Sequence, residues 1–337
     1  KQAVLLQRLL ATFRNLTIDP QRFAIRRTEL QNSWLSARTE HPYRQTSSAI
    51  NNLLVSSSWS PELLAATIGE VTVAQLESWR KRRLQHFSVE GLVHGNVTET
   101  DVTQLQNIIS AAIPLREFAL VRPTIANTQR ASRLPLEIDH QVAAMVLYLQ
   151  DPDDALGTRA KSTLAVHLMR QPYFTSLRTE QQLGYVVGVS TKPLRNRGSV
   201  TFLVQSPVAD PKALQHATYN FMDNYLDTLL AMSEEDFNEY RTGLISELTE
   251  QDKNLGMRSG RYWTDLRLGY ASFDRQQQLA DAIAKLTKTE MKTYMTALRS
   301  RLPKERLIAY STGKFSDVPS EGAQIRDATD YKSTLFS

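Results

Sequence analysis

The side chains best suited to holding a catalytic metal are six histidines, and their spacing decides whether a metal motif is present. They are His41, His86, His94, His140, His167 and His216. A zinc-binding helix places two imidazoles four residues apart, as in His-x-x-Glu-His or His-Glu-x-x-His, and the glutamate serves as the base. No two of these histidines have that spacing. The sequence therefore contains no recognisable zinc motif.

Other reactive groups are equally sparse. The chain has no cysteine, which excludes disulfides, thiolate metal ligands and a cysteine nucleophile. It also lacks the glycine-rich loops that hold phosphates and the Gly-x-Ser-x-Gly turn of serine hydrolases. The carboxylates of Asp151, Asp153 and Asp154 cluster without EF-hand spacing, so we interpret them as a turn before a helix near residues 157–171. His167 falls within that helix, where we expect a structural role.

The densest cluster of cations is Trp79-Arg80-Lys81-Arg82-Arg83. Such a run can bind nucleic acid, but a binding surface for single strands combines a stripe of cations with stacking aromatic rings. Cations also suit the negative end of a helix dipole. The formal net charge of +5 is modest for 337 residues. We therefore expect this run to close a helix, and we predict no nucleic-acid partner.

Composition indicates an ordinary globular protein. Hydrophobic residues make up 41% of the chain and charged residues 22%, and 337 residues suffice for two domains. The longest apolar run, Val142–Leu149, is far shorter than the roughly 20 residues that cross a bilayer. The sequence therefore predicts no insertion into a membrane.

Helical and strand patterns occupy different parts of the chain. Apolar residues recur at steps of three and four from Phe237 to Leu248, and Ser233 is placed to cap the helix that they predict. Residues 141–150 form a compact apolar run typical of a buried strand. Residues 184–190 and 199–205 flank a polar turn that contains glycine, which predicts a hairpin.

Two segments near opposite ends of the chain are similar. Residues 23–30 share Phe, Arg, Thr and Leu with residues 237–244 at an offset of 214 (237 − 23). Residues 68–79 resemble residues 283–294 at an offset of 215 (283 − 68). Chance explains one match between amphipathic helices, but two matches at nearly the same offset favour an internal repeat. Each copy then leads into a predicted strand, Val89–Val93 in the first and Arg306–Ser311 in the second.

The two copies differ in what precedes them. About eighty residues, from about 134 to 214, come before the second copy and hold its strands and first helix, whereas only about twenty precede the first. We therefore expect the chain to be a fragment whose first domain is truncated at its N-terminus. A domain cut through its sheet exposes apolar surface and unpaired edges, so it should need the missing part for stability.

The most distinctive motif is Leu177-Arg178-Thr179-x-x-Gln182-Leu183-Gly184-Tyr185. It resembles the pitrilysin (protease III-like) family of zinc metalloproteases, which includes insulin-degrading enzyme and nardilysin. His94-Gly95-Asn96, after the predicted strand at 89–93, is similar to the end of that family's third domain. The resemblance extends through essentially the whole chain and marks it as the C-terminal part of such a protein.

The resemblance implies a fold and a domain division. Family members have four related α+β domains, in which helices pack in a second layer on a largely antiparallel sheet, and two bowl-shaped halves enclose a chamber. Residues 1–115 would be the C-terminal portion of the third domain. Residues 116–337 would be a complete fourth domain. The internal repeat is what two such domains would produce.

The resemblance also implies roles for individual residues. Arg178 and Tyr185 match the positions that reach toward substrate at the zinc site, and we expect both to bind substrate. Phe174, Leu177 and Leu183 are expected in the core, and Gly184 is expected to end the helix so that Tyr185 can start a strand. No residue of this chain is predicted to be catalytic or to bind metal.

The leading hypothesis is a metalloendopeptidase that cleaves peptides small enough to enter its chamber. This chain would form chamber wall and substrate contacts, zinc would be bound by the N-terminal catalytic half, and the chain alone would be inactive. Bacterial relatives suggest the periplasm. The alternative is a non-catalytic peptide-binding or structural subunit of the same fold.

Overall fold

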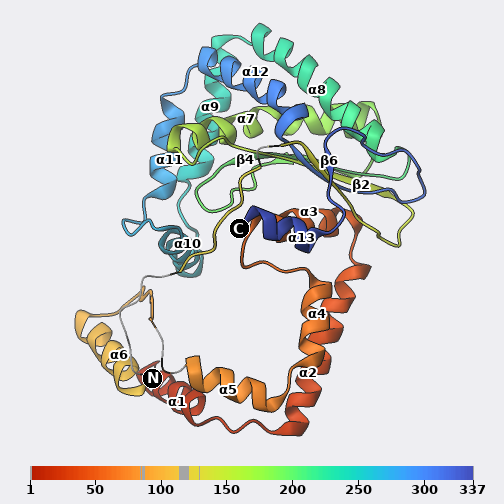
Figure 1. The fold of residues 1–337 in the computed structure, drawn as a ribbon. Coiled ribbons are helices and arrows are strands. Elements are labelled where there is room, and N and C mark those ends of the chain that lie inside the picture. The colour runs from red at the N-terminus through yellow and green to blue at the C-terminus, as the bar shows by residue number, and fades with distance from the viewer. Residues whose placement is uncertain (1, 84, 86–87, 114–120, 129, 337) are drawn as a thin grey trace. The chain divides into compact units, whose positions relative to one another are not determined.

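The computed structural model describes residues 2–83, 85, 88–113, 121–128 and 130–336 (Figure 1). Contacts group them into two compact units that interleave along the chain. Unit 1 contains Lys1–Ser36, Pro61–Arg122 and Asp252–Arg267, and unit 2 contains Ala37–Ser60, Pro123–Gln251 and Leu268–Ser337. The predicted domain boundary between residues 115 and 116 falls among residues 114–120, outside the described residues, and stays a prediction.

Unit 2 is built on one six-stranded sheet in the order β3-β4-β2-β5-β1-β6. The strands are β1 (Ser132–Pro135), β2 (Ala143–Gln150), β3 (Val186–Ser190), β4 (Ser199–Ser206), β5 (Leu307–Ser311) and β6 (Ala323–Gln324). The pairs β3–β4, β4–β2 and β2–β5 are antiparallel, whereas β1 lies parallel to β5 and β6. The predicted buried strand, the hairpin and the α+β fold with a largely antiparallel sheet are confirmed.

Helices cover both faces of this sheet, and every side chain of β2 is therefore buried. Met145, Leu147 and Leu149 face one core cluster, and Val146 and Tyr148 face the other. The first cluster includes side chains of α7 (Leu156–Phe174), α8 (Pro211–Ala231), α9 (Glu234–Thr249), α11 (Arg275–Ala284) and α12 (Lys288–Glu305). The second includes side chains of α3 (Pro42–Leu54), with α13 (Ala328–Leu335) packed against it (Figure 1).

The regular elements in the described part of unit 1 are all helices. Its helices are α1 (Gln2–Asn15), α2 (Pro20–Leu35), α4 (Pro61–Glu70), α5 (Val73–Arg83), α6 (Glu99–Ala112) and α10 (Leu255–Leu268). The short η1 (Ser36–Thr39) follows α2, and all of it except Ser36 is grouped with unit 2. The last residue of α10, Leu268, is grouped with unit 2. The predicted strand at Val89–Val93 is wrong, because this segment is irregular. A strand needs a neighbour to pair with, and the described part of unit 1 supplies none.

Several local predictions are confirmed by the helix ends. The Ser233 hydroxyl accepts from the backbone N–H of Asp236 and caps α9. The basic run Arg80–Arg83 forms the last turn of α5, where its positive charges interact favourably with the negative end of the helix dipole. None of the described helices is both long enough and apolar enough to cross a membrane.

The internal repeat is visible in matching contacts. Arg27 lies over the Phe23 ring and donates to the Val71 carbonyl at 3.2 Å. Its counterpart Arg241 lies over Phe237 and donates to the carbonyl of Leu286 at 2.7 Å. In each copy the same pair of interactions therefore fixes a helix to a loop about 45 residues further along the chain, the loop before α5 in the first copy and the loop before α12 in the second.

Candidate functional site

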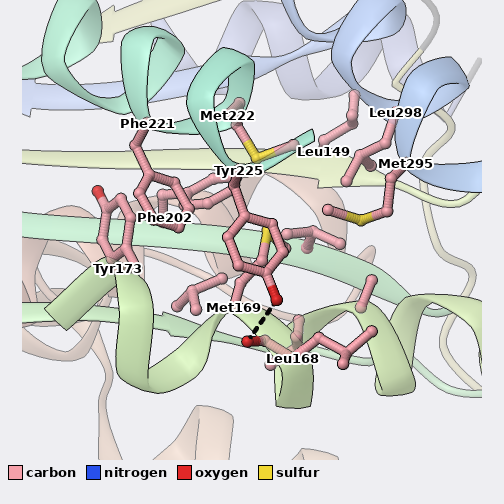
Figure 2. Close-up of a cluster of buried hydrophobic side chains, with 14 of the residues drawn as sticks. Leu149, Leu168, Met169, Tyr173, Phe202, Phe221, Met222, Tyr225, Met295 and Leu298 are labelled. Carbon is pink, nitrogen blue, oxygen red and sulfur yellow. Dashed lines mark hydrogen bonds between the residues drawn. The ribbon is translucent and has the colours of Figure 1, made fainter. Parts of the chain in front are cut away.

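The site begins at the C-terminal end of α7, where a proline interrupts the helix. Pro172 lies inside α7 and has no N–H to donate to the carbonyl of Leu168, four residues earlier. The Tyr225 hydroxyl of α8 donates to that carbonyl at 2.8 Å instead (Figure 2). A buried carbonyl without a partner is costly, so this bond offsets the hydrogen bond that the proline cannot donate. It also fixes the end of α7 against α8.

After Phe174 the backbone widens into a π-helical turn, η2 (Thr175–Glu180). Leu177 is fully buried, whereas Arg178 beside it is only half-buried. π-turns are rare and are frequent at functional sites. The turn inserts an extra residue into the helical repeat, and it lets Leu177 stay in the core while Arg178 reaches the surface.

The helix ends differently from the expectation. Gln182, with a φ of 52°, takes the left-handed conformation, and the N–H of Leu183 donates back to the Leu177 carbonyl at 2.9 Å. Gly184 has an ordinary φ and is needed for a different reason. A Cβ on Gly184 would lie 1.9 Å from the carbonyl oxygen of Gln205 in β4. Gly184 therefore permits close packing against β4, and β3 starts at Val186.

The structure brings the two predicted substrate residues together. The Arg178 guanidinium lies 5.5 Å from the Tyr185 ring centroid and 4.8 Å from that of Phe174. Tyr185 is 82% exposed. A guanidinium that stacks on an aromatic ring through its flat face keeps its N–H donors available. The arrangement presents a cation and a phenol hydroxyl side by side on one surface.

Phe174 is the residue that sequence reasoning missed. It was expected in the core with Leu177 and Leu183, and those two are buried or pack on the core. Phe174 is half-buried and lies beneath the Arg178 guanidinium. Its spacing of four residues from Arg178 is the signal that could have found it, since side chains at i and i+4 of a helix meet.

Lys192, which follows β3, has a lowered pKa because it is buried. Burial lowers the pKa of Lys192 to about 8, and its ammonium donates to the Ser47 carbonyl of the α3 helix at 2.6 Å. The backbone N–H of Lys192 is held by the Ser199 hydroxyl at 3.0 Å. These bonds tie the segment after β3 to α3 and β4.

His167 of α7 shares no contact partner with Arg178 among the interactions described here. It lines a hollow of about 790 Å³ with side chains of α8 and α9, including Asp236, Glu239 and Tyr240. Its Nδ1 is 3.7 Å from Glu247, and burial lowers the pKa of its imidazole. Among the residues that the structure describes, no group of three or more His, Asp or Glu side chains is arranged to hold a metal. His86 lies outside the described residues.

Two family profiles match the chain. Residues 1–67 match the middle or third domain of peptidase M16, and residues 164–263 match domain 4 of the C-terminal lobe of PqqF-like PQQ synthase. The second match includes the segment from Phe174 to Tyr185. Neither match reaches residue 115.

Curated relatives are similar over most of the chain. A Schizosaccharomyces pombe protein, mug138, whose name describes it as a zinc protease, is 28% identical over 307 residues, which are 87% of this chain and 31% of the relative. The A-factor-processing enzyme of Saccharomyces cerevisiae is 26% identical across 100% of this chain and 35% of its own length. The chain thus spans about a third of the length of these relatives.

Solved structures share the fold. Pitrilysin superposes with a TM-score of 0.84 at 18% identity, covering 99% of this chain and 36% of that one. A peptidase M16 inactive domain from Pseudomonas fluorescens gives 0.67 at 15% identity over 94% of this chain and 76% of that one. The periplasmic protease PqqL of Escherichia coli gives 0.63 at 16% identity over 98% of this chain and 39% of that one.

The profile matches, the relatives and the shared fold agree with one another and with the motif around Arg178. The chain is thus similar in sequence to the C-terminal part of insulin-degrading enzyme and in fold to that of pitrilysin, and its first 67 residues match a domain of peptidase M16.

Proposed function

We propose that this chain is the zinc-free C-terminal part of a pitrilysin-like metalloendopeptidase and that it contacts the peptide substrate through Arg178 and Tyr185. The observation that carries the proposal is the pairing of these two side chains at the surface. Tyr185 is 82% exposed, and its ring rests against a guanidinium that also stacks on Phe174. A tyrosine that is exposed to this extent is typical of a binding surface, where Tyr and Arg often carry the binding energy.

The chemistry that these groups supply is hydrogen-bond donation to a carbonyl. Peptide hydrolysis develops negative charge on the scissile oxygen, and positioned donors stabilise that charge. The Phe174 ring and the buried Leu177 restrict how far the Arg178 side chain can move, so less conformational freedom is lost on binding. The zinc ion would activate the attacking water and would be bound by the N-terminal half. This chain alone would be inactive.

The test mixes this chain with a separately produced N-terminal half and zinc, and it measures cleavage of a quenched fluorescent peptide. Arg178→Ala should lower kcat/KM by ~10²-fold, the usual cost of removing one such donor. Tyr185→Phe keeps the ring against Arg178 and removes only the hydroxyl, so it isolates the donor. Arg178→Lys keeps the charge but loses the flat guanidinium.

The matched control is Arg299→Ala in α12. Arg299 also stacks on a tyrosine ring, at 5.1 Å from Tyr219, and it is ion-paired to Asp223. We expect its loss to leave turnover unchanged. Full activity in both Arg178→Ala and Tyr185→Phe, with the control equally active, would remove the proposed role of the pair.

The proposed compartment is the periplasm. It rests on one structural neighbour, the periplasmic protease PqqL of Escherichia coli. Fractionation of cells that express the parent protein, with cytosolic and periplasmic marker enzymes measured alongside, tests this assignment. Recovery with the cytosolic marker would contradict it.

A non-catalytic subunit of the same fold is the second candidate. The solved structure named as a peptidase M16 inactive domain shares the fold over 94% of this chain and favours this possibility. The two candidates differ in whether the parent polypeptide carries a His-x-x-Glu-His helix. If it does not, cleavage should be absent while peptide binding through Arg178 persists.

A further inference from the structure

The turn between β4 and α8 presents an apolar surface to solvent. It consists of Pro207, Val208 and Ala209, of which Pro207 is exposed and Val208 is 63% exposed. Exposed turns are usually made of Gly, Pro, Asn, Asp and Ser, because these residues suit the backbone of a turn. Single exposed apolar residues are ordinary, whereas neighbouring ones can mark a binding surface. Turn chemistry accounts for Pro207 and leaves the exposed Val208 without a structural reason.

Hydrogen bonds from both ends hold this turn in one conformation. The hydroxyl of Ser206, a fully buried residue, accepts from the backbone N–H of Val208 at 3.1 Å and from that of Ala209 at 2.8 Å. The Asp210 carboxylate accepts from the N–H of Ala213 at 2.7 Å and caps α8. The N–H groups of the turn are therefore already bonded, and a ligand would meet its apolar side chains.

The turn begins beside Tyr185. A Cβ on Gly184 would lie 1.9 Å from the carbonyl oxygen of Gln205 and 3.3 Å from the Cα of Ser206, so Gly184 packs directly on the end of β4. Val186 pairs with Gln205. Tyr185 stands between these two residues and is therefore held against the last residues of β4, where the turn starts.

Both segments also lie on the same side of the sheet. Leu183, two residues before Tyr185, and Ala209, next to Val208, pack against the same core cluster, which includes side chains of α7 and α8. Tyr185 and Val208 themselves are 82% and 63% exposed. Side chains whose backbone is already fixed lose little further freedom when a ligand covers them.

We propose that Val208 is a specificity-determining residue, and that it receives, together with the Tyr185 ring, an apolar side chain of the bound peptide. The inference rests on the proposed function, because Arg178 and Tyr185 fix the main chain of that peptide and the turn meets a side chain beside it. Covering apolar surface on both partners favours leucine over a polar residue of similar size, since the polar residue gives up hydrogen bonds to water.

Two probe peptides of nearly equal size measure this preference. They are acetyl-Ala-Ala-Leu-Ala-Ala-amide and the same peptide with asparagine in place of leucine. Each is titrated into the full chain carrying ¹³C-labelled valine and leucine methyl groups. The Val208 methyl signals should shift with the leucine probe. That probe should bind about tenfold more tightly than the asparagine probe, the lower end of the discrimination that a hydrophobic pocket achieves.

Leu230 provides the matched control, because it is 44% exposed and lies near the other end of α8. At 1.5 Å per residue it is roughly 30 Å from the turn. Val208→Asn should reduce the preference for the leucine probe to within about twofold, whereas Leu230→Asn should leave it unchanged. Val208→Lys should make a probe with a central glutamate bind better than the leucine probe. Unchanged methyl signals of the buried Val204 verify that each variant is folded.

Equal binding of the leucine and asparagine probes to the unmodified chain, including binding too weak to detect, would overturn the inference. So would a Val208→Asn variant that keeps the full preference, or methyl shifts at Leu230 as large as those at Val208. The proposed function fails in a different way. In that case Arg178→Ala would bind both probes as tightly as the unmodified chain does, whereas failure at Val208 alone leaves Arg178→Ala weaker for both probes by the same factor.

Discussion

Helices α2 and α9 are built alike and lie in different environments. Both carry a phenylalanine beneath an arginine, and the arginine donates to a backbone carbonyl in a loop about 45 residues further along the chain. In unit 2, Phe237 and Leu244 are 1% and 3% exposed because the helix packs on the core above the sheet. In unit 1 the matching Leu30 is 47% exposed. The contact between the phenylalanine and the arginine is thus encoded in the sequence of each helix, whereas the burial of the helix depends on the elements that pack against it.

The exposed apolar residues of unit 1 extend over several helices. They include Leu5, Leu9, Leu30, Leu35, Leu63, Trp79 and Trp263, each at least 38% exposed. The described part of unit 1 contributes only Ala65 and Ile113 to the buried hydrophobic residues. A surface of this kind normally marks an interface. We expect the N-terminal half of the proposed parent protein to cover it.

The largest expected effect is a difference in stability between equivalent substitutions in the two copies of the internal repeat. Phe237→Ala should lower the free energy of unfolding of unit 2 by ~3–5 kcal/mol, the usual cost of a large cavity in a core. Phe23→Ala should cost much less in this chain, because Phe23 is only half-buried. Urea unfolding of both variants measures the difference. Equal costs would show that unit 1 already has a core of the same quality, and addition of the N-terminal half should raise the cost of Phe23→Ala.

Two glycines provide the next comparison. Gly184→Ala should destabilise unit 2 by ~1–3 kcal/mol, because the new Cβ would meet the backbone oxygen of Gln205 at 1.9 Å. Gly69→Ala in α4 meets only the end of the Gln31 side chain, at 2.9 Å, which can move. Alanine also suits a helix better than glycine. Thermal unfolding should show a clear loss for the first and little change for the second, and the reverse order would contradict the close approach at Gly184.

Two aspartates should give the units opposite responses to pH. Burial raises the pKa of Asp151 in unit 2, whereas hydrogen bonding to Arg261 lowers the pKa of Asp252 in unit 1. A raised folded pKa means that the folded state takes up a proton before the unfolded state as pH falls. Unit 2 should therefore gain stability from Asp151 as pH falls toward the ordinary carboxyl range, and lose it as pH rises through the raised pKa.

Asp252 contributes in the other direction. Its stabilisation is present above the ordinary carboxyl pKa and disappears as pH falls through the lowered one. Denaturant unfolding from acidic to neutral pH, with Asp151→Asn and Asp252→Asn compared with the unmodified chain, separates the two contributions. Asp151→Asn should flatten the dependence in unit 2, since the amide can still accept from the Tyr294 hydroxyl. An unchanged profile would show that Asp151 titrates normally.

The smallest expected effect is also the one that should be equal in both units. Thr72 and Thr287 each accept from a backbone N–H three residues on, at 3.2 Å in both cases. Thr72→Ala and Thr287→Ala should each cost about 1 kcal/mol, the usual value of an N-cap. Circular dichroism during urea unfolding measures this cost. Markedly different costs would mean that the cap depends on the sheet and is not local.

Sequence reasoning succeeded where the signal is local. The α9 cap at Ser233, the hairpin formed by β3 and β4, and the helix closed by Arg80–Arg83 were all predicted. Each depends on residues close in sequence.

The failures were tertiary. The strand expected at Val89–Val93 is irregular in the absence of a described neighbour. The π-turn after Phe174 and the left-handed Gln182 have no composition signal, because they arise from fitting Leu177 into the core while the chain reaches β4. For the same reason Gly184 was assigned to a helix end when its role is close packing. The substrate role of Arg178 and Tyr185 stays a prediction.

The way the two units share the chain has a practical consequence. The chain passes from one to the other after Ser36, Ser60, Arg122, Gln251 and Arg267. Helix α3 therefore packs on the sheet of unit 2, although α2 and α4, which precede and follow it in the sequence, belong to unit 1. No single cut can release unit 2 intact, so expression of residues from Pro123 onward should give a product that lacks α3, exposes Val146 and Tyr148, and aggregates.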